Sequence, residues 1–185
     1  MNRNHIIWMT RTAVLVALLV SVQAATAPLA AIPMLRQYLS GSIINMILII
    51  SVMAVSTSTG LVVAIVSPVF ASLLGIVPGW QWPLVPLIAL GNASLVLIWR
   101  LFGKREIVNK YVNRVLTIGL AAVVKFLVLF VGVVQIMLKV LQLPPPQVNA
   151  ISAAFSITQI FTATIGGILA SLALPIIIKA TRNNK

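Results

Sequence analysis

The sequence predicts an all-α integral membrane protein, a single domain built as a bundle of six transmembrane helices. Hydrophobic residues make up 61% of its 185 residues, and the mean hydropathy is +1.13. A soluble domain of this composition would expose apolar surface on every side, whereas a lipid bilayer tolerates it. The apolar runs are continuous rather than alternating, which favours helices over the strands of a membrane barrel. Six spans of roughly 20 residues with short loops account for the whole chain.

Turn-forming residues divide the chain into these six segments. Pro28 and Pro33 are expected to end the first helix, and the prolines at 144–146 force the last turn. The first segment also has the pattern of a signal peptide, but Pro28 would directly follow the cut, so an uncleaved first span is expected. The predicted helices are residues 6–26, 41–55, 61–77, 84–102, 112–143 and 147–178.

Lys and Arg are distributed unevenly between the two predicted faces of the membrane. Ten of the 13 lie at the termini or around the loop between the fourth and fifth helices. Arg36 and Lys139 fall on the other side, and Lys125 lies inside a span. Because cytoplasmic loops carry the excess of Lys and Arg, both termini are expected in the cytoplasm. The same rule accounts for the net charge of +12, so membrane lipid is an expected partner and nucleic acid is not.

Groups that support catalysis are almost absent from the sequence. The chain has one carboxylate side chain, Glu106, one histidine and no cysteine. Paired-carboxylate catalysis and a Cys or multi-His metal site therefore cannot be built. Magnesium-dependent phosphoryl transfer also needs carboxylates on the metal, so the chain is not expected to be an ATPase by itself. We expect no enzymatic activity, no metal site and no cofactor.

Polar residues enter the apolar phase on particular helix faces. At about 100° per residue, Lys125 shares one arc of the fifth helix with Gln135, Lys139 and Gln142, and the sixth helix has a similar small-or-polar arc. Such residues either join helices by hydrogen bonds or line a cavity, and for Lys125 a structural role and a gating or partner contact stay open. The candidate cavity residues within the spans are Asn45, Asn92, Gln135, Lys139 and Gln159.

The predicted outer loops and the first helix add two further features. Aromatic rings with a few polar groups above a concave opening are typical of a small-molecule site, although an interfacial aromatic belt has the same composition. On the first helix, Ala13 and Ala17 form a small-xxx-small pair that allows another helix to approach closely. The loop residues added to the predicted substrate-binding set are Arg36, Tyr38, Trp80 and Trp82.

Taken together, the chain resembles a substrate-binding S component of an energy-coupling factor (ECF) vitamin transporter. The resemblance covers the whole chain and includes the six short-looped helices and the scarcity of acidic residues. It also includes the segment TRTAVLVA (10–17), which opens the first helix. Three further segments are similar to members associated with cobalamin: SGSIIN (40–45), SPVFA (67–71) and VPLIALGN (85–92).

The resemblance implies a location in the plasma membrane of a bacterium and a set of partners. The chain would bind one vitamin from outside and dock on a membrane T protein driven by two cytoplasmic ATP-binding subunits. In the family, an AxxxA motif on the first helix packs against the T protein, and this motif maps onto Ala13 and Ala17. The ligand site would lie near the outer surface, between helices four to six and the loops after helices one, three and five.

The ligand is expected to be cobalamin, a large and mostly neutral molecule with many amide groups. The absence of an available carboxylate disfavours a cation such as thiamine, whereas pantothenate, folate, riboflavin and biotin remain as alternatives. Two other classes of function also stay open at this point. One is a channel or carrier that works alone, and the other is a membrane scaffold without a ligand.

Overall fold

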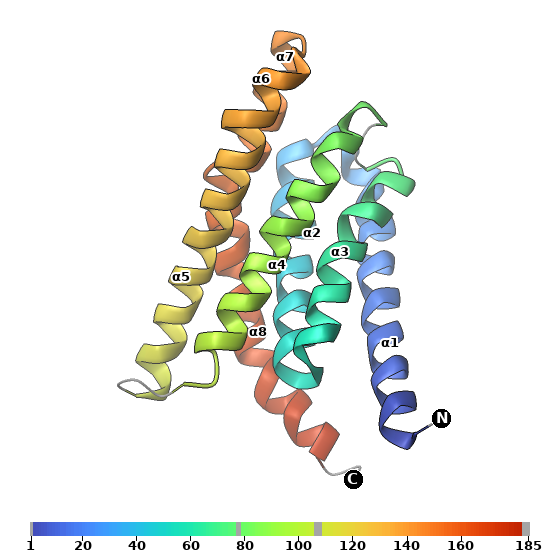
Figure 1. Cartoon of the computed structure of the whole chain (residues 1–185), viewed down its shortest axis with the longest axis vertical. Helices are drawn as coiled ribbons and strands as arrows, with labels where there is room; N and C mark the ends of the chain where they lie inside the picture. The colour runs from blue at the N-terminus through green and yellow to red at the C-terminus, as the bar shows by residue number, and fades with distance from the viewer. Residues whose placement is uncertain (1, 77–78, 106–108, 183–185) are drawn as a thin grey trace.

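The structure, a computed structural model, describes residues 2–76, 79–105 and 109–182. Every regular element in these ranges is a helix, and the long helices run up and down as one bundle with both termini at the same end (Figure 1). The α-helices are α1 (Arg3–Thr26), α2 (Pro33–Ile50), α3 (Thr57–Leu73), α4 (Val85–Phe102), α5 (Lys110–Leu129), α6 (Leu138–Leu141), α7 (Pro145–Phe155) and α8 (Thr158–Arg182). The 3₁₀ segments are η1 (Ala27–Ala31) and η3 (Gly79–Leu84), and the π-helical segments are η2 (Ser51–Val55) and η4 (Phe130–Met137).

Within the described residues, five helical segments are long and apolar enough to cross a membrane, which agrees with the predicted all-α bundle. They are residues 3–29, 33–55, 81–102, 110–141 and 145–180. The remaining apolar helix, α3, has 17 residues. At about 1.5 Å per residue it is roughly 26 Å long, slightly less than a hydrocarbon core of about 30 Å. The predicted sixth span is therefore present as a helix but is the shortest of the set.

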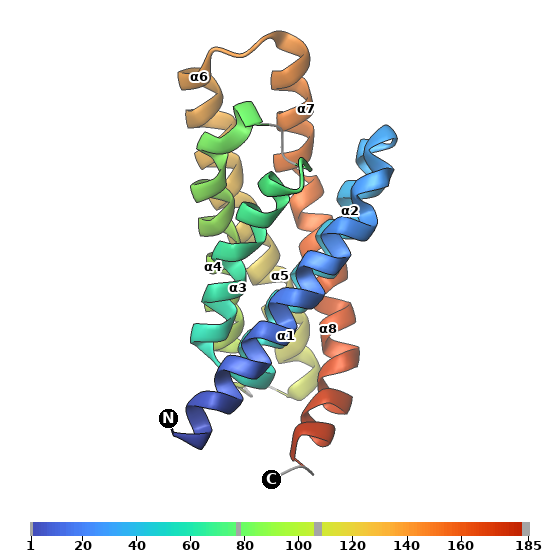
Figure 2. The same ribbon diagram turned by 90° about the vertical axis from the view of Figure 1, so that its right-hand side faces the viewer.

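The core of the bundle lies between α2, α4, α5 and α8. Helix α2 packs along α8, α4 lies between α3 and α5, and α1 crosses the face formed by α2 and α3 (Figure 2). Trp99 and Leu48 are among the fully buried side chains of this core. Many large apolar side chains point outward instead, among them Leu172 at 69% and Ile176 at 73% exposure. An outward apolar surface of this extent is suited to lipid.

The predicted boundary between the first two helices is wrong. Residues 33–40 were expected in an outer loop, but α2 begins at Pro33 and contains Arg36 and Tyr38. Proline is favoured at the first position of a helix, where its missing N–H is not needed. Pro33 therefore starts the second helix rather than only ending the first. Helix α3 likewise begins before the predicted residue 61, because the Ser56 Oγ caps it by accepting the Thr59 N–H at 3.1 Å.

The two long helices predicted at the C-terminal side are not continuous α-helices. Residues 110–141 contain the π segment η4, and residues 145–182 are divided at Ser156, where the backbone leaves the helical region. The carbonyl groups freed by this break are bonded by nearby side chains. The Thr158 hydroxyl donates to the Ala153 carbonyl at 2.7 Å, and the Gln159 amide donates to the Ala154 carbonyl at 2.8 Å. Side-chain capping of this kind allows a helix to break inside an apolar bundle.

Candidate functional site

A cavity of about 700 Å³ opens at the end of the bundle opposite both termini. Residues of α1, α2, α3, α4, α5, α7 and α8 line it, together with Gln81 of η3. Exposed residues such as Pro33 and Ala150 form its rim, and buried polar side chains form its floor. Its volume lies in the range of sites for small organic molecules, about 300–1,000 Å³.

The floor is built around Lys125 of α5, which is only 4% exposed. Its Nζ donates to the Asn45 Oδ1 of α2 at 2.6 Å and to the Asn92 Oδ1 of α4 at 2.8 Å. Because an ammonium group only donates, both amides must present their oxygens to it. Three residues from three helices therefore meet at one point, and one N–H of the ammonium group is left over.

The local backbone explains the position of Asn92. Pro68 lies inside α3 and has no N–H, so it cannot donate to the Ala64 carbonyl one turn earlier. The Asn92 Nδ2 donates to that carbonyl instead, at 3.5 Å. The amide of Asn92 thus bridges a proline-freed carbonyl on α3 and the ammonium group of Lys125. Because the Asn92 Nδ2 is bonded to α3, its Oδ1 is the atom that faces Lys125 at the cavity floor.

Close helix packing explains the position of Asn45. Gly166 of α8 lies so near α2 that a Cβ atom on it would be 2.5 Å from the Asn45 Cβ and 2.7 Å from the Ser42 carbonyl oxygen. Small residues permit such a contact between membrane helices. With α8 seated against it, Asn45 is 1% exposed and presents its amide to the cavity.

Two buried polar atoms of the cavity have no hydrogen-bond partner among the described residues: the Asn45 Nδ2 and the Gln23 Oε1. The other end of the Gln23 amide donates to the Ser67 carbonyl at 2.9 Å, which orients the oxygen. Unpartnered buried polar atoms are costly, so a donor and an acceptor on a cavity wall are suited to a polar ligand or to water.

The structure brings four of the nine predicted binding residues to this cavity: Arg36, Asn45, Asn92 and Gln159. Arg36 lies near the rim, where its Nη2 donates to the Ile76 carbonyl at 3.4 Å. Tyr38 contacts Phe161 edge-on and Trp82 is 44% exposed, and neither is a lining residue. The side chain of Trp80 lies outside the described part of the chain.

Gln135 and Lys139 are exposed and do not line the cavity, although they were predicted to share a face with Lys125. The π segment η4 lies between Lys125 and Lys139. A π turn contains more residues than an α turn, so every later residue falls behind its α-helical angle. The prediction of a common face assumed a regular α-helix and is wrong for this reason.

Sequence reasoning left two members of the site without a role. The sequence pattern leaves Lys125 open between a structural role and a gating or partner contact, and it does not assign Gln23 to the site. A signal for Gln23 exists, because it lies four residues after the buried Leu19 and eleven after the buried Thr12, on one face of α1. In the sequence, this spacing indicates a polar residue on the buried face of a membrane helix.

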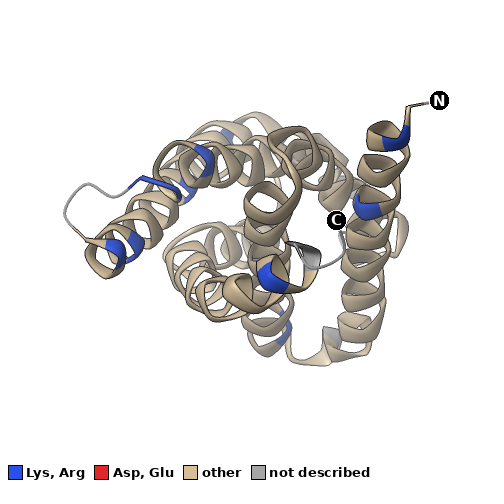
Figure 3. Cartoon of the chain, turned by 90° about the horizontal axis from the view of Figure 1, so that it is seen from below, with Lys and Arg blue, Asp and Glu red and all other residues tan. Residues whose placement is uncertain are grey.

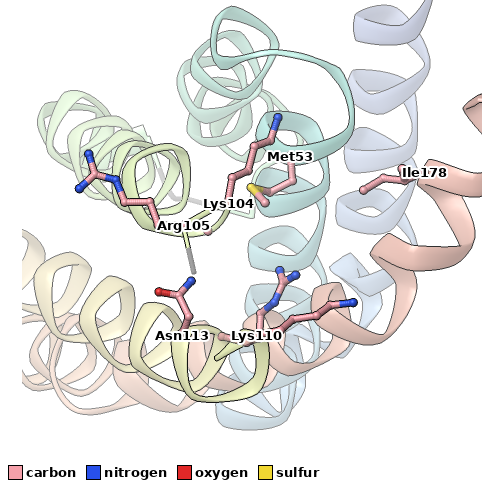
Figure 4. A pocket seen from close by; sticks show the side chains of 8 residues that line it. Met53, Lys104, Arg105, Lys110, Asn113 and Ile178 are labelled. Atoms are coloured by element: carbon pink, nitrogen blue, oxygen red, sulfur yellow. The ribbon is translucent and has the colours of Figure 1, made fainter. Parts of the chain in front are cut away.

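A second hollow, of about 250 Å³, lies at the end that carries the termini. Four cationic residues line it, Lys104, Arg105, Lys110 and Arg114, together with Met53, Asn113 and Ile178 (Figure 4). The Arg114 guanidinium lies 5.4 Å from the centre of the Trp99 ring. These cations belong to the basic cluster on this end of the bundle (Figure 3).

Comparison of the chain with models of protein families, with curated proteins and with solved structures finds no match.

Proposed function

We propose that this chain is the membrane-embedded, substrate-binding subunit of an ATP-driven vitamin uptake system of the ECF type. The observation that carries the proposal is the cavity with a buried polar floor at one end of an apolar bundle. Convergent polar groups in a largely apolar hollow are typical of a small-molecule binding site. The vitamin predicted from the sequence is cobalamin, with pantothenate, folate, riboflavin and biotin as the alternatives.

The cavity ends inside the bundle, which favours a binding subunit over a channel. Toward the termini, the residues that follow its floor on α2 and α4 belong to the packed core, among them Leu48, Val96 and Trp99. These three side chains are 0% exposed, and Ser51, Val52 and Met53 of η2, which continues α2, are buried as well. A ligand that enters this cavity cannot cross the bundle without a rearrangement, and its accumulation against a concentration gradient requires an energy source.

We propose that the energy comes from partner subunits. The whole chain has one acidic residue, so it lacks the carboxylates that hold magnesium in ATPases. The proposed partners are a membrane T protein and two cytoplasmic ATP-binding subunits. Ala13 and Ala17 of α1, the proposed docking pair, are exposed on the side of the bundle. Both are therefore free to meet another helix.

The proposed location is the plasma membrane of a bacterium, with the cavity open to the outside and both termini in the cytoplasm. Eight Lys and Arg residues lie on elements at the end with the termini: Arg3, Arg11, Arg100, Lys104, Arg105, Lys110, Arg114 and Lys179. Arg36 and Lys139 lie toward the other end. An excess of positive charge on one side is typical of the cytoplasmic face.

Binding and transport measurements on one pair of variants test the function. The purified chain should bind one of the five vitamins in calorimetry, and cells should need the partner ATPases to take it up. The Ala13→Trp variant should keep this binding and lose uptake, because a bulky group would separate α1 from the T protein. The control is Val14→Trp, a change at a 61% exposed residue on an adjacent face of the same helix.

Two results would contradict the proposal. If the chain alone in liposomes accumulates a vitamin by using an ion gradient, it is a carrier that works by itself. If it binds none of the five vitamins and copurifies with no ATP-binding subunit, the scaffold function is the better description.

A further inference from the structure

We propose that the ligand of this cavity is a small organic acid whose carboxylate binds at the floor, beside Lys125 and the amide of Asn45. This inference rests on the proposed function and deepens it, because it names the chemical class of the ligand. It also separates the five candidate vitamins, which differ in whether they carry a carboxylate.

Lys125 has no counter-ion among the described residues that line the cavity. Lys125 is 4% exposed in the middle of a membrane-type bundle, and its two partners are neutral amides. Buried charges are normally paired, because removal of an ion from water costs several kcal/mol even after relaxation. No acidic side chain lines the cavity within the described part of the chain. A carboxylate supplied by a ligand would complete the ion pair.

The floor of the cavity has two hydrogen-bond donors without a partner among the described residues. The ammonium group of Lys125 has three N–H groups, of which two are used. The Asn45 Oδ1 accepts one of them, and the Nδ2 of the same amide is buried and has no partner among the described residues. The two groups with unused donors, the Lys125 ammonium group and the Asn45 amide, are therefore hydrogen-bonded directly to each other. A carboxylate has two oxygens and accepts from paired donors of this kind.

The walls of the cavity determine what the rest of the ligand must look like. Above the floor the walls are mainly apolar, with Ile88, Leu129, Ile151 and Phe155 as large members. The Gln23 Oε1 on the α1 side needs a donor. The ligand that fits is therefore an acid with an apolar body and at least one hydroxyl or amide N–H. Pantothenate and biotin have this form, with a single carboxylate at the end of a slender body.

Cobalamin fits this site less well than an acidic vitamin does. The sequence-based argument for cobalamin assumed a ligand that needs no buried opposing charge. The floor of the cavity contains such a charge, and cobalamin and riboflavin have no carboxylate to meet it. A cavity of about 700 Å³ is also better matched to the smaller acids.

Matched acidic and neutral ligands test the inference on the purified chain and on two of its variants. Calorimetry in detergent compares pantothenate with pantothenol, in which an alcohol replaces the carboxylate, and biotin with its primary amide. We expect one of the acids to bind, and its neutral partner to bind at least tenfold more weakly. Lys125→Met should weaken the acid at least tenfold and abolish the difference within that pair. Lys139→Met, at an exposed lysine outside the cavity, should change neither affinity.

The outcomes separate the inference from the proposed function. Equal binding of the acid and its neutral partner, or an unchanged affinity in Lys125→Met, would overturn the carboxylate site. Tight binding of cobalamin or riboflavin, with neither acid bound, would overturn it as well and leave the vitamin-binding function standing. Failure of all five vitamins to bind would contradict both. Thermal unfolding of each variant verifies that it is folded before its affinity is compared.

Discussion

At the scale of single residues, the most consequential contact is the one between Lys125 and two asparagines. The ammonium group is held by two amide oxygens at 2.6 Å and 2.8 Å, and none of the described cavity residues neutralises it. Neutral partners lower the cost of burying the charge but do not remove it. A charge held in this way stabilises the complex with an anion more than it stabilises the empty protein.

The substitution Asn45→Asp tests this description. It would place a carboxylate beside Lys125 and remove the unpartnered Asn45 Nδ2. We expect the ligand-free protein to unfold at a higher temperature, because the buried ammonium group gains a counter-ion and a charge-assisted hydrogen bond. An acidic ligand should bind at least tenfold more weakly, since its site is already occupied.

Thermal unfolding and calorimetry in the same detergent measure the two effects. The matched control is Asn149→Asp, the same chemical change at an exposed residue of α7 outside the cavity. A lower unfolding temperature for Asn45→Asp, with acid binding unchanged, would show that Lys125 does not act as an unpaired cation.

At the scale of the elements, the site depends on how closely helices approach and on how they are interrupted. Glycines permit the approach: a Cβ on Gly91 of α4 would be 2.6 Å from Leu129 of α5, and one on Gly166 would be 2.5 Å from the Asn45 Cβ. Interruptions set the direction of the side chains, as Pro68 does for Asn92 and η4 does for the residues after Lys125. The three helices that carry the floor are positioned by these contacts.

Gly166→Ala is expected to destabilise the protein by about 1–3 kcal/mol, because the added methyl overlaps both a side chain and a backbone carbonyl of α2. It should also weaken ligand binding, since Asn45 is displaced from Lys125. Chemical or thermal unfolding in detergent gives the first quantity and calorimetry the second. Gly119→Ala is the control: it lies in α5 with nothing within 4 Å of the new Cβ, so stability should be unchanged or slightly higher. Equal effects of the two substitutions would argue against a close contact between α2 and α8.

At the scale of the whole molecule, the bundle has an apolar outer surface and two unlike ends. Basic residues gather at the end with the termini (Figure 3), and the residues that line the cavity belong to the other end of the bundle. In an uptake system the ligand arrives from outside, and the ATP-binding partners lie inside. The charge asymmetry therefore predicts that the cavity faces outward.

Cysteine labelling tests this orientation directly, because the natural chain contains no cysteine. Single cysteines are placed at Arg105, at the basic end, and at the exposed Trp82, at the cavity end. In intact cells an impermeant thiol reagent should label position 82 and not position 105. Permeabilised cells, in which both should react, serve as the control. The reverse pattern would place the cavity in the cytoplasm and contradict the uptake function.

The sequence by itself determined the class of the molecule. Continuous apolar runs and a single acidic residue predicted an all-α bundle without catalytic carboxylates, and α4 begins within one residue of its predicted start. These properties are local or compositional, so they do not depend on which helices become neighbours. The predicted polar positions Asn45, Asn92 and Gln159 also line the cavity, because polar residues in apolar helices tend to face inward.

Only the tertiary structure decided the site. Lys125 contacts residues that are 80 and 33 positions away in the chain, and no periodicity relates them. Their meeting depends on the approach of α8 to α2 through Gly166 and on a proline-freed carbonyl on α3. Gln135 and Lys139 lie outside the cavity because of the π turn in η4. A π turn contains less than one residue more than an α turn, but this is enough to change the direction of the side chains that follow it. Angular phase accumulates along a helix, so one such turn decides which side chains reach the cavity and which face outward.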